Sequence, residues 1–125
     1  MRMFSRIIAL CGLTLFGWPP CMVWGHAFPY HSEPKVGAIL PVAPSRIRIW
    51  FDGALEPAFS SLHVQDATGQ RVDTGDGHVD SADATLLEVN LRPLAPGPYR
   101  VTWSVVARDG HRTEGDFMFT IQRRD

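Results

Sequence analysis

Asp109, Gly110 and His111 form the segment of this chain with the clearest potential for chemistry. They directly follow the strongest strand pattern of the sequence, in residues 99–106 (YRVTWSVV). In an extended segment, residues i and i+2 point to the same side, so the Asp109 carboxylate and the His111 imidazole would converge on one point. This pair suits a metal ion. Taken alone, it is equally well explained as a histidine hydrogen-bonded to a carboxylate at a strand end.

His26 is the second candidate, and its chemistry depends on processing of the chain. Residues 1–18 (MRMFSRIIALCGLTLFGW) combine a basic start with an apolar run too short to span a bilayer comfortably, which is typical of a secretory signal peptide. The small residue Gly25 predicts cleavage after it, which makes His26 the first residue. Its α-amino nitrogen and imidazole Nδ1 can then chelate a metal, with reference pKa values of about 7.7–8.0 and about 6.5. Exposure of a histidine by chance is the alternative.

Together, His26, Asp109 and His111 offer three nitrogens and one or two carboxylate oxygens. This donor set suits Cu(II) and lacks the thiolate or thioether sulfur that Cu(I) prefers. Zinc accepts the same donors, so the ligands alone leave the metal open. The other three histidines are interpreted as surface or hydrogen-bonding residues: His31, His63 and His78. Of these, His31 could lie near the metal.

The elements that must position these residues are predicted to be β-strands. Residues 46–52 (RIRIWFD) alternate in the period of two that is typical of a half-buried strand. Similar patterns, separated by turn signals at 66–69, 73–83 and 93–98, occur at 61–66, 86–91, 99–106 and 116–122. No segment shows a convincing helical periodicity. The pattern predicts an all-β fold, an antiparallel β-sandwich or small barrel of immunoglobulin-like type, with five residues expected in its core: Trp50, Trp103, Phe117, Phe119 and Ile121.

Residues 73–83 (DTGDGHVDSAD) concentrate aspartates around His78, which raises the possibility of a calcium loop. Their spacing does not fit the EF-hand pattern of alternating ligands followed by a glycine and a distant glutamate. A solvated turn is the better interpretation.

Composition narrows the class of protein further. The chain has 125 residues, of which 45% are hydrophobic and 20% charged, as expected for one globular domain. Residues 26–125 contain no cysteine, which excludes disulfides from the processed chain. They carry 10 basic and 13 acidic residues, a net charge of −3 with neutral histidines. This charge disfavours nucleic acid as a partner.

Four segments of the chain have a recognisable pattern: the signal peptide followed by His26-Ala27, residues 32–38 (SEPKVGA), residues 66–72 (DATGQRV) and above all residues 94–119 (LAPGPYRVTWSVVARDGHRTEGDFMF). In these segments the chain resembles the CopC-like family of periplasmic copper-binding proteins. The resemblance covers nearly all of residues 26–125. It implies that this stretch is one domain, a Greek-key β-sandwich, with one Cu(II) ion bound by His26, Asp109 and His111.

The resemblance also implies a non-catalytic periplasmic protein. Such a protein would sequester copper, or carry it to an inner-membrane transporter of the CopD type or to another periplasmic copper protein. Some relatives hold Cu(I) in a methionine-rich loop, but the only methionine of residues 26–125 is Met118, which is expected to be packed within a strand. We therefore expect no Cu(I) site. Residues 28–31 (FPYH) depart from the family's usual start, and Pro29 could alter how His26 is presented.

An enzyme is the alternative hypothesis. A terminal histidine and a second histidine on a β-sandwich also form the histidine brace of copper-dependent lytic polysaccharide monooxygenases. Those enzymes leave coordination positions open for oxygen and present a broad substrate face. Here Asp109 would fill one position, and a domain of this size leaves little chain for such a face, so a carrier is the preferred hypothesis.

Overall fold

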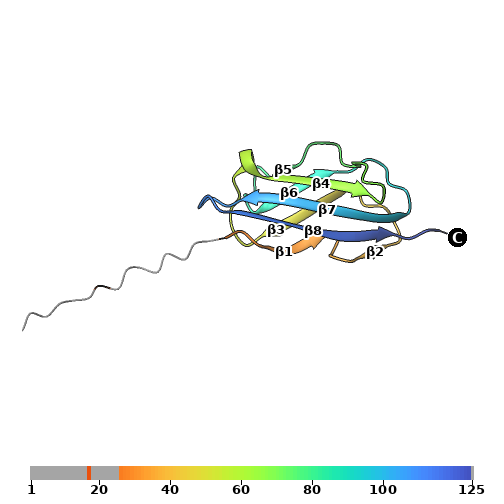
Figure 1. Cartoon of the computed structure of the whole chain (residues 1–125), viewed down its shortest axis with the longest axis horizontal. Coiled ribbons are helices and arrows are strands. Elements are labelled where there is room, and N and C mark those ends of the chain that lie inside the picture. Colours follow the sequence, from red (N-terminus) through yellow and green to blue (C-terminus); the bar gives the residue numbers. More distant parts are fainter. Residues whose placement is uncertain (1–16, 18–25, 125) are drawn as a thin grey trace, which may run out of the picture.

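Two four-stranded sheets pack face to face in the computed structural model, which describes Gly17 and residues 26–124 (Figure 1). The first sheet has the order β1 (Pro29–Glu33), β3 (Arg46–Phe51), β6 (Leu86–Asn90), β5 (His78–Val79). The second has the order β2 (Ile39–Leu40), β8 (Arg112–Ile121), β7 (Gly97–Val106), β4 (Ser61–Asp66). The predicted signal peptide, residues 1–25, lies outside the described residues apart from Gly17.

Helical structure in the described part of the chain is limited to one short 3-10 turn, Pro57–Phe59. None of the described residues belongs to a helix long and apolar enough to cross a membrane. The predicted all-β sandwich is confirmed.

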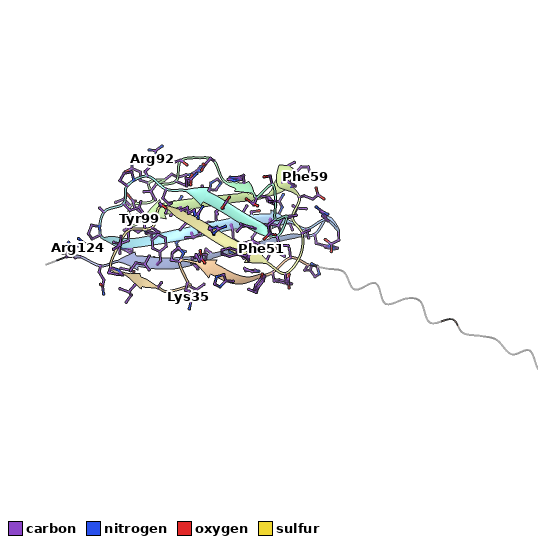
Figure 2. The ribbon with its side chains drawn as sticks, turned by 180° about the vertical axis from the view of Figure 1, so that it is seen from behind. Lys35, Phe51, Phe59, Arg92, Tyr99 and Arg124 are labelled. Carbon is purple, nitrogen blue, oxygen red and sulfur yellow. The ribbon has the colours of Figure 1, made fainter. Side chains whose placement is uncertain are left out.

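Alternation along the strands places every second side chain between the two sheets. In β3 the buried residues are Ile47, Ile49 and Phe51, and in β7 the same period buries every second residue from Tyr99 to Val105. Trp103 packs edge-on against Phe51 at 5.3 Å between ring centroids. Phe51 and Tyr99 lie toward opposite ends of this core (Figure 2). The predicted burial is confirmed for four of the five expected core residues: Trp103, Phe117, Phe119 and Ile121.

The fifth expected core residue, Trp50, lies on the outer face of its sheet. The period of two that buries Ile49 and Phe51 directs Trp50 outward, where it is half-buried. The guanidinium carbon of Arg48 lies 4.9 Å from its ring centroid, and the His31 ring lies 5.0 Å away. Met118 was expected to be packed within a strand. It lies in β8, but the period of two directs its side chain outward, where it is 42% exposed.

Three strands were not predicted, because each is short or lacks apolar alternation. In β1 only Ser32 is buried, and the strand is held by main-chain pairing with β3. β2 pairs with β8 at only two positions, and it does so in parallel, so the sandwich is not purely antiparallel. β5 falls within residues 73–83, where a solvated turn was predicted, and Val79 is buried there.

The same loop contains a buried carboxylate, Asp73, which is 3% exposed. It accepts hydrogen bonds from Arg71 Nη2 (2.7 Å) and from the backbone amides of Val64 (2.9 Å) and Gly75 (3.0 Å). Burial alone would raise the pKa of Asp73. The hydrogen bonds and the charge of Arg71 outweigh it, so the pKa is lowered from its usual value. The ionised carboxylate therefore ties this loop to β4.

Asp73→Asn should lower the free energy of unfolding at pH 7 by about 2 kcal/mol, because the amide turns one acceptor into a donor that faces N–H groups. The folded pKa of Asp73 lies below the unfolded value of about 3.9, so its contribution is complete above that pH and is lost as the pH falls through the folded value. Urea unfolding of both proteins from pH 7 to pH 2 measures this.

Asp116→Asn is the control, since this exposed carboxylate pairs with Arg100 at the surface and should contribute less than about 1 kcal/mol. A difference between wild type and Asp73→Asn that does not change with pH would contradict the assignment.

Candidate metal centre

His26, Asp109 and His111 come together at one end of the sandwich. Their nitrogen and oxygen donor atoms all lie within 4.8 Å of one another. The imidazole rings of His26 and His111 are 4.8 Å apart between centroids and nearly perpendicular. The turn between β7 and β8 lies at the same end of the molecule as the chain entering β1, opposite to the C-terminus (Figure 1). The structure thus brings together all three residues selected from the sequence.

The turn between β7 and β8 determines where Asp109 and His111 lie. The N–H of Ala107 donates to the carbonyl of His111, and the N–H of Gly110 donates to the carbonyl of Ala107, both at 2.9 Å. Gly110 has a φ of 90°, which side chains disfavour, although no atom outside its chain neighbours lies within 4 Å of a Cβ placed there. The expectation of an extended segment was therefore wrong. A tight turn brings the two side chains together instead.

Both carboxylate oxygens of Asp109 face His111. Oδ1 accepts a hydrogen bond from the backbone N–H of His111 at 2.9 Å, and Oδ2 lies 3.3 Å from the ring Nδ1. The backbone hydrogen bond is the largest cause of a lowered pKa of Asp109, and the charges of the His111 and His26 rings lower it further. The carboxylate is therefore ionised at neutral pH and held in one orientation, as a metal ligand must be.

The residues that follow His26 are anchored to both sheets. Ala27 is fully buried, and its carbonyl accepts a hydrogen bond from Thr113 Oγ1 at 2.7 Å. The N–H of Phe28 donates to Asp52 Oδ1 at 2.7 Å, and the N–H of Asp52 donates back to the carbonyl of Phe28 at 2.9 Å. His26 is thus directly bonded to a residue, Ala27, whose position is fixed by burial and by the hydrogen bond from Thr113.

Sequence reasoning missed Thr113 and Asp52 as positioning residues. Thr113 lies in β8, two residues beyond His111, and Asp52 directly follows β3. Neither stands out by type or spacing. Pairing of β1 with β3 brings Phe28 beside Asp52, and the packing of the two sheets brings Ala27 beside Thr113 of β8.

The other histidines of the described chain belong to different surroundings. His31 on β1 packs against Trp50, and its Nε2 lies 3.6 Å from Oε1 of Glu33. In His78 on β5, the ring Nε2 lies 3.3 Å from Oε1 of Glu88. Among residues 26–124, the donor cluster of three contains neither these two nor His63.

The donors at this site are hard or borderline in character. Two imidazoles and one carboxylate suit Cu(II) and Zn(II), and no sulfur ligand is among them. His26 and Asp109 are exposed and the His111 side chain is accessible, so an ion bound here could exchange with another protein directly.

Residues 30–122 match the CopC domain family. Protein YobA from Escherichia coli strain K12 is 33% identical over 101 residues, which cover 80% of this chain and 82% of YobA. The copper transport protein CutJ from Bacillus subtilis is 30% identical over 107 residues, which cover 85% of this chain but only 20% of CutJ.

Two solved structures share the fold. CopC from Methylosinus trichosporium OB3b superposes with a TM-score of 0.70 at 29% identity, covering 80% of this chain and 97% of that protein. PcoC, a methionine-rich copper resistance protein from Escherichia coli, has a TM-score of 0.66 at 24% identity, covering 78% of this chain and all of PcoC. At this lower identity, the PcoC match supports the fold alone.

Gly110→Ala should destabilise the fold by about 1–2 kcal/mol, because a Cβ is strained at this positive φ. Thermal unfolding measures the effect. Gly53→Ala is the matched control: its φ is not positive, and an added Cβ would meet Ala27 at an ordinary 3.7 Å. Equal stability of the two variants would contradict the role given to the turn.

Proposed function

The chain belongs to the CopC domain family of copper proteins, and on that basis we propose that it binds one Cu(II) ion through His26, Asp109 and His111. The observation that carries the proposal is the convergence of these three donor groups within 4.8 Å from two distant parts of the chain. Their chemistry is that of a Cu(II) site. Zinc remains the natural competitor in a binding experiment.

We further propose that residues 1–25 are a signal peptide and that residues 26–125 are the mature domain in the periplasm. Cleavage after Gly25 frees the α-amino nitrogen of His26, which adds a further nitrogen donor beside the imidazole. The buried Ala27 supports this assignment, because it fixes the backbone directly after His26 and so keeps the new terminus at the site.

The proposed role as a copper carrier rests on the accessibility of the metal centre. Copper is held at an accessible end of the domain and not in an enclosed cavity, which suits sequestration and transfer by ligand exchange. The relative CutJ is named a copper transport protein. We propose that the recipient is an inner-membrane transporter of the CopD type or another periplasmic copper protein, and that the domain itself is not an enzyme.

One extra glycine before His26 should weaken Cu(II) binding by more than about 100-fold while leaving the fold intact. It turns the α-amine of His26 into a peptide nitrogen and moves the free amine one residue away from the chelating imidazole. The expected loss exceeds the 10- to 100-fold effect usual for a residue that only supports a ligand. Chelator competition and electron paramagnetic resonance of the protein starting at His26, with and without the extra residue, measure it. A protein with one glycine added after Asp125 is the control. Equal affinity in all three would refute the terminal chelate.

Thr113→Val should weaken Cu(II) binding about tenfold, because it keeps the side-chain shape but removes the hydrogen bond to the Ala27 carbonyl. The paramagnetic spectrum should change as the two nitrogens of His26 lose their fixed position. Thr102→Val, on the exposed face of β7, is the matched control and should bind as wild type does. An unaltered spectrum and affinity for Thr113→Val would show that this anchor does not position the site.

A further inference from the structure

An apolar groove lies between β1 and β8, where the two sheets leave one side of the sandwich open. Its volume is about 560 Å³, and its apolar lining comes from both sheets and from the loop between β1 and β2: Pro29, Val36, Ile49, Trp103 and Phe117. Tyr30 and Val36 are 68% and 71% exposed along it. β1 and β8 follow the same side of the molecule (Figure 1), and Lys35 marks this edge in Figure 2.

β8 presents main-chain groups to this side that β2 does not reach. β2 pairs only with Thr120 and Ile121. The Met118 carbonyl accepts from the N–H of Gly37 (2.7 Å), so the even-numbered residues of β8 direct their main chain away from β7. By this alternation, Glu114 and Asp116 direct their N–H and C=O groups to the groove side, where no main-chain partner is found among residues 26–124.

Trp103 packs directly against Gly115 of β8 at the floor of the groove. A Cβ on Gly115 would lie 2.5 Å from Cζ2 of Trp103, so the indole fills the space that a side chain would occupy there. The side chains of Glu114 and Asp116 lie on the opposite, outer face of β8 and are exposed. A strand placed against this edge would therefore meet apolar surface on one face and carboxylates on the other.

The charges argue against a second copy of this chain at the edge. Two β8 strands pairing antiparallel about Gly115 would place Glu114 opposite Asp116 of the other copy, and like charges directly opposite each other are destabilising. Arg100 pairs with Asp116 from β7, on the side away from the groove. A strand added on the groove side of β8 would therefore lie beside Glu114 and Asp116 and farther from Arg100. Lysine or arginine on the outer face of that strand would complement the two carboxylates.

We propose that β8 between Thr113 and Phe117 accepts an extended segment of a partner protein as an added strand. Apolar side chains of that segment fill the groove, and basic side chains alternate with them and face Glu114 and Asp116. Thr113, at one end of this segment of β8, donates a hydrogen bond to the carbonyl of Ala27, the residue next to His26, so the bound strand would end beside the candidate metal centre. The proposal goes beyond copper binding and does not require it.

The test uses metal-free protein and, as the probe, an acetylated and amidated hexapeptide that alternates lysine and valine. Amide exchange and chemical shifts followed by nuclear magnetic resonance should show protection of the Glu114 and Asp116 amides. Glu114→Pro removes an N–H that the β7 ladder does not use, as proline on a strand edge can. It should weaken binding at least about tenfold relative to Glu114→Ala, which keeps the N–H and loses the same charge.

A second measurement leaves the protein unchanged. One version of the peptide is N-methylated at its lysines and the other at its valines. Each version therefore lacks the N–H groups along one of its two main-chain edges. Only the version blocked on the edge that faces β8 should lose binding. Equal binding of both versions, or of Glu114→Pro and Glu114→Ala, would overturn the proposal. Protection of the same amides by self-association without peptide would also overturn it, since the edge would then serve a second copy.

Discussion

The main-chain ladder between β7 and β8 runs without a break over ten residue pairs, from Gly97 and Ile121 to Val106 and Arg112. Because its side chains alternate, one face of this hairpin supplies much of the core. Its two strands are joined by the turn that contains Asp109 and His111. A change in the register of this ladder would therefore alter the core and the candidate metal centre together.

The same hairpin also determines how the start of the domain is held. Thr113 lies in β8 just past the turn, and it binds the carbonyl of the buried Ala27. Asp52 holds Phe28 from the other sheet. His26 is consequently placed by contacts to both sheets, so the donor cluster forms only in the fully assembled sandwich. Beyond Thr113, β2 leaves an edge of β8 uncovered, and this is the edge that we propose accepts a strand of a partner protein.

Much of the fold could be predicted from the sequence, because most strands carry their own signal. The alternation in residues 46–52 and 61–66 matches β3 and β4 closely. β1 carries no such signal, since it buries only Ser32 and depends on its neighbour β3. The outward position of Trp50 and the exposure of Met118 follow from the period of two. Hydrophobic residue type gave the wrong expectation at both positions.

By itself, the sequence determined the β-sandwich class, the family resemblance and the choice of His26, Asp109 and His111, because residue type and strand periodicity are local properties. The tertiary structure alone decided that these three side chains meet within 4.8 Å. It also assigned positioning roles to Thr113 and Asp52, and it left the main-chain groups of Glu114 and Asp116 without a main-chain partner among residues 26–124. These features depend on which strands become neighbours, and that is set by the packing of two sheets from segments far apart in the chain.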